Sequence, residues 1–294
     1  MGELEGGWTA QAIVCGVTAC GVLAVGCSPL ATPGSGYCAP PVSSRWSVPE
    51  DVPSLDADRT ERLAAILGLR AELLARRSPG GERSTEAQVR GLARIEAVRV
   101  ALDATGAELS CESERADQAA DYLERRQSQT VQALTVSSIL ASTATSVAGV
   151  LLSTSGASAT SQDLVAIGGG AVTAGLGLGS IWVHPTIRFQ HARNLLADIW
   201  TGPRYSTAYP APVWAYLMRG EFSNDRTRPI REQIVARWRS LQTIDGSAST
   251  LLFGAGGSYD VETLRARSAM LDQVRAEVDL ENQEIALLAS ELLR

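Results

Sequence analysis

The two histidines are the first residues to consider for chemistry, because the chain has no others. His184 and His191 are seven residues apart, and Asp198 follows seven residues later. On a helix the three would share one face, but two turns separate neighbouring side chains. The ring nitrogens would then lie too far apart to share a metal ion, unlike an i, i+4 pair. We therefore expect a structural role for both histidines.

The rest of the sequence offers no catalytic motif. All 26 basic residues are arginine, so no lysine amine is available for a Schiff base, a P-loop or a Ser-Lys pair. No GxSxG, HExxH or GxGxxG motif occurs, and Glu112, Glu114, Asp117 and Asp121 follow the pattern of charges on a helix surface. We expect no enzyme activity, no cofactor and no metal. A net charge of -6 also argues against nucleic acid as a partner.

An apolar run over residues 12–26, AIVCGVTACGVLAVG, precedes Cys27. The run is uncharged, short for a membrane span and of the right length for the core of a signal peptide. Its end, Leu23-Ala24-Val25-Gly26-Cys27, resembles a bacterial lipobox, in which small residues precede a cysteine that receives diacylglycerol. The resemblance implies a lipoprotein of the cell envelope that begins at Cys27, with membrane lipid as its partner. It places the protein at the outer membrane or the periplasmic face.

The residues before this run depart from the signal-peptide pattern. Residues 1–11 carry Glu3 and Glu5 and no arginine, whereas an export signal normally has a positively charged start. One alternative is an inner-membrane anchor over about residues 8–26 with the body in the cytoplasm. The other is a buried apolar helix.

Cys38 and Cys111 remain if the signal peptide is removed and Cys27 is acylated. They could pair as a disulfide in an oxidising compartment. They could equally be two unpaired buried thiols, because no spacing rule links residues so far apart.

Composition and hydropathy patterning predict an all-α fold. Only 5% of the residues are aromatic, which argues against a β-sandwich or barrel. We expect an elongated helical bundle or coiled coil from which a Gly-rich helical hairpin projects. The chain divides into a signal peptide or anchor (1–26), a Pro/Gly/Ser-rich tether (27–53), the first part of the bundle (54–130), an apolar hairpin (131–187) and the second part of the bundle (188–294).

Apolar stripes give the expected helices in more detail. The predicted helices cover residues 55–77, a segment from Thr85 to a break near Gly106, a segment from about Glu108, and residues 186–200, 229–241 and 261–293, with a loop over 245–257.

The last of these helices carries the cleanest pattern. Five apolar residues recur every seven positions and predict a coiled-coil seam, which Arg267 and Glu281 interrupt. The seam needs a partner helix, which we expect within the chain at residues 55–102 or 108–127, with self-association as the alternative. The five residues are Leu264, Leu271, Val278, Ile285 and Leu292.

The hairpin is defined by two apolar stretches, residues 134–153 and 164–183. No ionisable residue lies between Arg126 and Asp163, and each stretch is about long enough to cross a bilayer. Serines and threonines make the first stretch only marginally hydrophobic. It could therefore insert into a membrane or pack as a buried hairpin inside an oligomer or protein complex.

Small residues recur every four positions in the second stretch, at Ala171, Gly175 and Gly179. Such a ridge lets two helix backbones approach closely, as in the dimer motifs of membrane helices. We expect these residues to make the packing face of the hairpin.

The charges around the hairpin conflict with the lipobox. Arg125, Arg126, Arg188 and Arg193 flank its base, and Asp163 lies at its tip. In an inner membrane this distribution would place the body in the cytoplasm. A lipoprotein body would lie on the other side, unless the hairpin enters a different membrane or lies within an oligomer.

These patterns favour a membrane-anchored envelope lipoprotein with a structural or assembly role. The first alternative is an oligomeric pore or channel component, in which hairpins associate through the small-residue ridge and the Ser/Thr-rich stretch lines a wet lumen. The second is a soluble subunit of a helical assembly.

Overall fold

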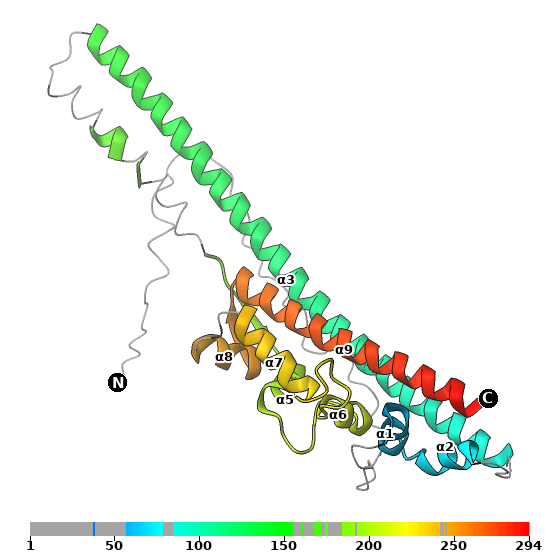
Figure 1. The fold of residues 1–294 in the computed structure, drawn as a ribbon. Coiled ribbons are helices and arrows are strands. Elements are labelled where there is room, and N and C mark those ends of the chain that lie inside the picture. The colour runs from blue at the N-terminus through cyan, green and yellow to red at the C-terminus, as the bar shows by residue number, and fades with distance from the viewer. Residues whose placement is uncertain are drawn as a thin grey trace, which may run out of the picture. The chain divides into compact units, whose positions relative to one another are not determined.

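The computed structural model describes residues 38, 57–78, 85–155, 160, 167–171, 174–175, 184–191, 193–241, 244 and 246–293. They belong to one compact unit, Pro33–Arg294. The expected all-α fold is confirmed, and the described residues contain just one small sheet, of two strands (Figure 1). In chain order the elements are α1 (Arg59–Ile66), α2 (Arg70–Arg77), α3 (Thr85–Thr154), β1 (Ile187–Gln190), α5 (Leu195–Thr201), α6 (Ala211–Leu217), α7 (Ile230–Leu241), α8 (Gly246–Phe253), β2 (Gly256–Tyr259) and α9 (Val261–Leu293).

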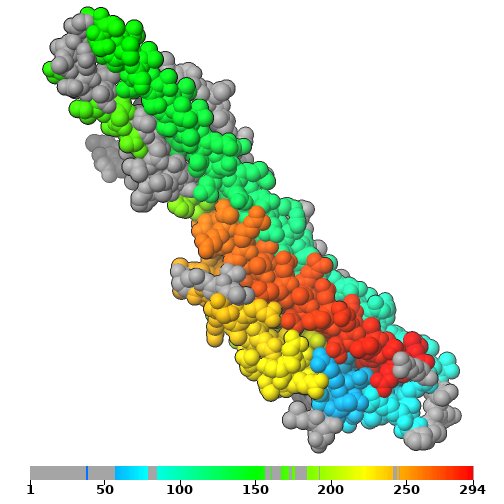
Figure 2. All heavy atoms as spheres, turned by 45° about the horizontal axis from the view of Figure 1, so that its top comes forward, coloured from blue at the N-terminus to red at the C-terminus, as the bar shows by residue number. Residues whose placement is uncertain are grey.

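Two long helices, α3 and α9, run antiparallel along the centre of the fold (Figure 1). Cross-helix hydrogen bonds fix their register: Asn282 donates to Asp103 at 3.2 Å, and the Ser113 and Ser268 hydroxyls lie 2.9 Å apart. The seam predicted for α9 is buried, so its partner helix lies within the chain. In Figure 2, α9 (orange to red) lies against α3 and is flanked by α7 in yellow and by α1 and α2 in blue.

Helix α3 is continuous, so the predicted break near Gly106 is wrong. Glycine in a helix costs about 1 kcal/mol relative to alanine, which motivated the prediction. Gly106 is buried, and a Cβ added to it would lie 3.9 Å from an Asp279 carboxylate oxygen. Packing against α9 therefore outweighs the local cost.

The predicted helix over residues 55–77 is two helices, because Gly68 ends the first. Gly68 has a φ of 67°, a left-handed conformation that suits glycine. The amide of Leu69 donates to the carbonyl of Ala64, and the amide of Gly68 to that of Ala65, which is a Schellman cap. The chain turns there, and both α1 and α2 pack on α9.

The predicted helix over residues 186–200 is also wrong in its first half. Residues 187–190 form β1, in which Ile187 and Phe189 are buried while Arg188 and Gln190 are exposed. The strand pairs antiparallel with β2, and Gln190 lies opposite Gly256. Gly256 has a φ of 96°, and a Cβ there would collide with the Phe189 carbonyl, so this close pairing requires glycine.

The predicted loop over residues 245–257 contains α8 and the start of β2. Helix α8 places Phe253 between two indoles: the Trp200 ring lies 4.3 Å from it and the Trp238 ring 6.1 Å, both stacked. Trp238 is fully buried. Tertiary contacts thus order a segment whose Gly/Ser content predicted a loop.

Candidate functional site

The C-terminal part of α3 has no buried side. We call Val131–Thr154 the arm and the other described elements, together with residues 85–130 of α3, the body. Residues in the first part of α3 pack into the body as far as Leu123, whereas none from Glu124 to Ser155 is buried. At 1.5 Å per residue the arm is about 36 Å long, against about 30 Å for the hydrocarbon core of a bilayer.

The arm exposes large apolar side chains. In the described part of the chain, one helix, α3, is long and apolar enough to cross a membrane, and its most apolar stretch has no buried residue. A soluble protein seldom exposes so long an apolar surface unless it serves as a binding surface. The side chains, each 54–63% exposed, are Val136, Ile139, Leu140, Val147, Val150 and Leu151.

The hydroxyl groups of the arm are bonded to its own backbone. Every serine and threonine from Thr135 to Thr154 donates to a carbonyl three or four residues earlier, as Ser137 does to Ala133 at 2.7 Å and Thr143 to Ile139 at 2.9 Å. A polar group that is already hydrogen-bonded costs less to remove from water. Because its hydroxyls are bonded in this way, the arm is less polar than its serine and threonine content suggests.

The second half of the hairpin is described at residues 167–171, which are helical, and at 174–175. Gly169 lies against the side chain of Thr145, and a Cβ on Gly169 would collide with it. Of the residues predicted to pack, Ala171 and Gly175 are exposed among the described residues, and a Cβ on Gly175 would meet no heavy atom within 4 Å. Gly179 lies outside the described residues.

Cys38 and Cys111 form a disulfide, with their Cα atoms 5.7 Å apart. Cys111 lies in the body part of α3, so the bridge attaches residue 38 to the middle of the helix pair. Of the two alternatives that the sequence left open, the structure thus contains the disulfide. Cys27, the predicted lipidation site, lies outside the described residues.

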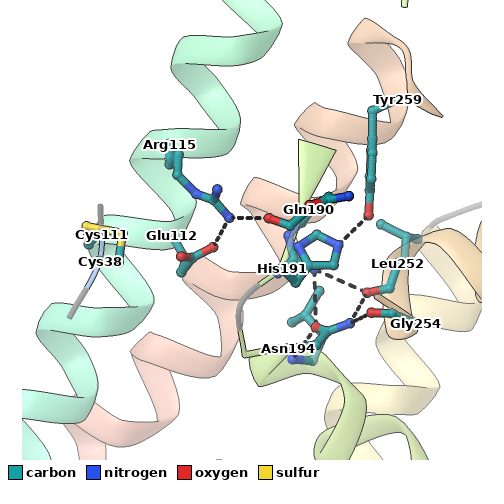
Figure 3. Close-up of polar contacts among 12 residues, drawn as sticks. Cys38, Cys111, Glu112, Arg115, Gln190, His191, Asn194, Leu252, Gly254 and Tyr259 are labelled. Atoms are coloured by element: carbon teal, nitrogen blue, oxygen red, sulfur yellow. Dashed lines mark hydrogen bonds and ion pairs between the residues drawn. A yellow bond between two sulfur atoms is a disulfide. The ribbon is translucent and has the colours of Figure 1, made fainter. Parts of the chain in front are cut away.

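A buried polar cluster attaches the small sheet to the long helices (Figure 3). Arg115 on α3 bonds to Glu112 at 2.7 Å and donates to the carbonyl of Gln190 at 3.0 Å. Its guanidinium also lies 4.1 Å from the centre of the Phe189 ring. These contacts hold β1 against α3.

His191 lies in the same cluster. Its Nε2 is 2.8 Å from the Tyr259 hydroxyl, which donates to the carbonyl of Leu251. Burial and the nearby Arg267 and Arg115 lower the pKa of His191 to about 3, so the ring is neutral. A neutral ring bonded to Tyr259 fits the structural role predicted for it.

The three residues proposed as a line on one helix do not share an element. His184 is exposed before β1, whereas His191 is buried after it. Asp198 on α5 accepts from the Ser206 hydroxyl at 2.6 Å and from the Thr207 amide at 2.8 Å, which orders the loop after α5. Within the described residues, no group of three or more His, Cys, Asp or Glu side chains could hold a metal ion.

The two polar residues in the α9 seam have different surroundings. Arg267 is fully buried and donates to Asn194 at 3.3 Å and to the carbonyl of Leu252 at 3.1 Å. Glu281 is fully buried, neither of its carboxyl oxygens has a hydrogen-bond partner among the described residues, and burial raises its pKa well above the usual value. A carboxyl group whose charged form is disfavoured by burial therefore interrupts the seam.

Sequence reasoning missed Asn194, which organises the contacts around Arg267. Its side chain accepts from the Leu196 amide at the start of α5 and donates to the carbonyls of Leu252 and Gly254, both at 2.8 Å. The sequence feature that could have indicated it is Arg267 at a seam position, because a buried arginine needs hydrogen-bond acceptors.

Comparisons of the chain with family models, with curated proteins and with solved structures gave no match in any of the three.

Proposed function

We propose that this chain is a membrane-anchored lipoprotein of the bacterial cell envelope with a structural or assembly role, and that its arm inserts into a lipid bilayer. The observation that carries the proposal is the arm itself: an apolar helix segment with no buried residue, whose hydroxyls bond to its own backbone. Lipid accommodates such a surface without leaving donors unsatisfied.

Two further features support an envelope location. The Cys38–Cys111 disulfide is typical of oxidising compartments such as the periplasm. The lipobox-like residues 23–27 supply a second attachment, because a diacylglycerol on Cys27 would hold the chain at a membrane. Intact mass spectrometry of protein from its native host, beside a Cys27→Ser variant, tests this attachment. Loss of residues 1–26 with a lipid adduct supports it, and a full-length unmodified chain contradicts it.

Protease protection in reconstituted vesicles tests insertion of the arm. Proteinase K should leave a fragment containing residues 127–162 that disappears when detergent is added. A Val136→Asp, Leu140→Asp, Val147→Asp variant should lose the fragment, since each aspartate at the centre of a membrane helix costs about 3 kcal/mol.

A matched control changes three equally exposed apolar residues of the body: Val89→Asp, Val100→Asp and Leu287→Asp. This variant should retain the fragment. A wild-type chain without a protected fragment, or protection that survives in the arm variant, would contradict insertion. Recovery of the chain in the aqueous phase of a detergent phase separation would favour the soluble assembly subunit.

An oligomeric pore is the second candidate. The exposure of Ala171 and Gly175 among the described residues favours it, because exposed small residues can pack against a second copy. The back-bonded hydroxyls of the arm count against a wet lumen on that side. Leakage from vesicles that Gly175→Leu abolishes would support the pore, and leakage that it leaves unchanged would contradict packing through this ridge.

A further inference from the structure

The end of the body from which the arm leaves carries three exposed arginines. Arg125 and Arg126 are the last charged residues of α3 before the arm, and Arg188 lies on β1. We call these three residues the arm base. None of the ion pairs found among the described residues includes any of them, and the one hydrogen bond found there for an arginine side chain is from Arg126 to the Tyr122 hydroxyl at 3.4 Å.

Residues far apart in sequence meet at this level of the helix pair. Arg265 on α9 lies beside residues 117–124 of α3, so the antiparallel register places the first residues of α9 near residue 124. Strand β2 immediately precedes α9 and pairs with β1, with Ser258 opposite Arg188. The β1 arginine therefore joins the two α3 arginines at the same end of the body.

Most of the acidic residues near the arm base are already engaged. Arg265 pairs with Asp117 at 3.1 Å, with Asp121, and with Glu124 at 3.5 Å. Asp260 caps α9 by accepting from the Thr263 amide at 2.9 Å. Glu262 is exposed at the same end. Three arginines thus face solvent beside carboxylates that are mostly bound elsewhere.

We propose that the arm base binds the phosphate groups of anionic phospholipids in the membrane that the arm enters. This inference rests on the proposed function. A membrane that takes up the arm brings its headgroups to the last charged residues of α3, and arginine binds phosphate oxygens through two parallel hydrogen bonds. Tyr122 lies at the same level, where an amphipathic ring suits the interface between water and lipid.

Flotation of the full chain tests the proposal with two kinds of vesicle, one of phosphatidylcholine alone and one containing equal parts phosphatidylcholine and phosphatidylglycerol. The wild type should prefer the anionic vesicles, and added salt should weaken the preference. Each arginine is expected to contribute about a fivefold preference. The ratio of the two affinities cancels any attachment through the N-terminal segment, which is shared by every variant.

An Arg125→Gln, Arg126→Gln, Arg188→Gln variant should lose most of this preference and keep its binding to phosphatidylcholine. Arg90→Gln, Arg99→Gln, Arg204→Gln gives the same net charge at exposed sites away from the arm base, and it should retain the preference. Equal binding of the wild type to both vesicles, or equal losses in the two variants, overturns the proposal while the inserted arm stands. Absence of the protease-protected fragment would instead overturn the proposed function.

Discussion

Arg115 on α3 covers the ring of Phe189 on β1, with its guanidinium carbon 4.1 Å from the ring centre. The same side chain is paired with Glu112, and only 3% of the Arg115 side chain is exposed. One residue thus joins a short strand to the central helix and neutralises a buried carboxylate.

Replacing Arg115 by glutamine should destabilise the body by about 3 kcal/mol, because the buried Glu112 would lose the cation to which it is hydrogen-bonded. Urea unfolding measures the loss. Arg90→Gln breaks an exposed pair with Glu86 and should cost less than about 1 kcal/mol. Similar losses in the two variants would contradict the role assigned to Arg115.

Glu281 should make the body less stable as the pH rises. Its pKa is raised in the folded chain, whereas an unfolded glutamate titrates near pH 4.3. The folded state therefore holds an extra proton above that pH, so the stabilisation is complete below it and is lost as the pH approaches the folded pKa. Tyr216 lies near this group, and the other charged groups near Tyr216 are Glu277, Glu284 and Arg59.

Glu281→Gln should flatten the dependence of the free energy of unfolding on pH, as measured by urea titrations at several pH values. Glu108, whose pKa burial raises to about 7, adds a slope of the same sign, so the difference between wild type and variant isolates Glu281. Glu86→Gln, at an exposed site, serves as the control. An unchanged slope in Glu281→Gln would mean that the carboxyl group is not buried as described.

Reduction of the Cys38–Cys111 disulfide should lower the melting temperature. The bridge closes a loop with a sequence separation of 73 residues. Loop-closure entropy for this length corresponds to about 4 kcal/mol, an upper value for most disulfides. Calorimetry with and without reductant measures the shift, and a Cys38→Ser, Cys111→Ser variant should be insensitive to reductant.

Gly169 and Gly175 in the hairpin should respond differently to a larger side chain. Gly169→Leu should separate the hairpin, because the new side chain meets Thr145, whereas Gly175→Leu should leave the single chain intact. Limited proteolysis of the hairpin in each variant reports on this separation. Equal cleavage rates in the two variants would contradict the contact. Thr145→Ala combined with Gly169→Ala should restore much of what Gly169→Ala alone loses.

The sequence predicted those parts of the fold in which one periodicity decides the structure. Helix α9 has a seven-residue repeat strong enough to survive Arg267 and Glu281, and its partner was expected within the chain. The apolar arm followed from an absence of charge between Arg126 and Asp163. Each of these two patterns extends over many consecutive residues and depends on no contact with a distant part of the sequence.

The remaining elements depend on contacts that no local pattern reveals. Strand β1 exists because Gly256 allows β2 to approach closely, and α8 is ordered by the indoles of Trp200 and Trp238. Gly106 stays helical because α9 packs beside it. In each case a partner distant in sequence outweighs the local preference.

The disulfide also limits how far Cys27 can lie from the body. Without it, 30 residues separate Cys27 from Ala57, where the body begins, and a fully extended chain of that length reaches about 100 Å. With it, 11 residues separate Cys27 from the point held at Cys111, which shortens the reach to about 40 Å. Arg126 lies about 22 Å from Cys111 along α3. If Cys27 carries the proposed acyl chain and the arm inserts as proposed, the shorter reach would still allow both to attach to one membrane surface.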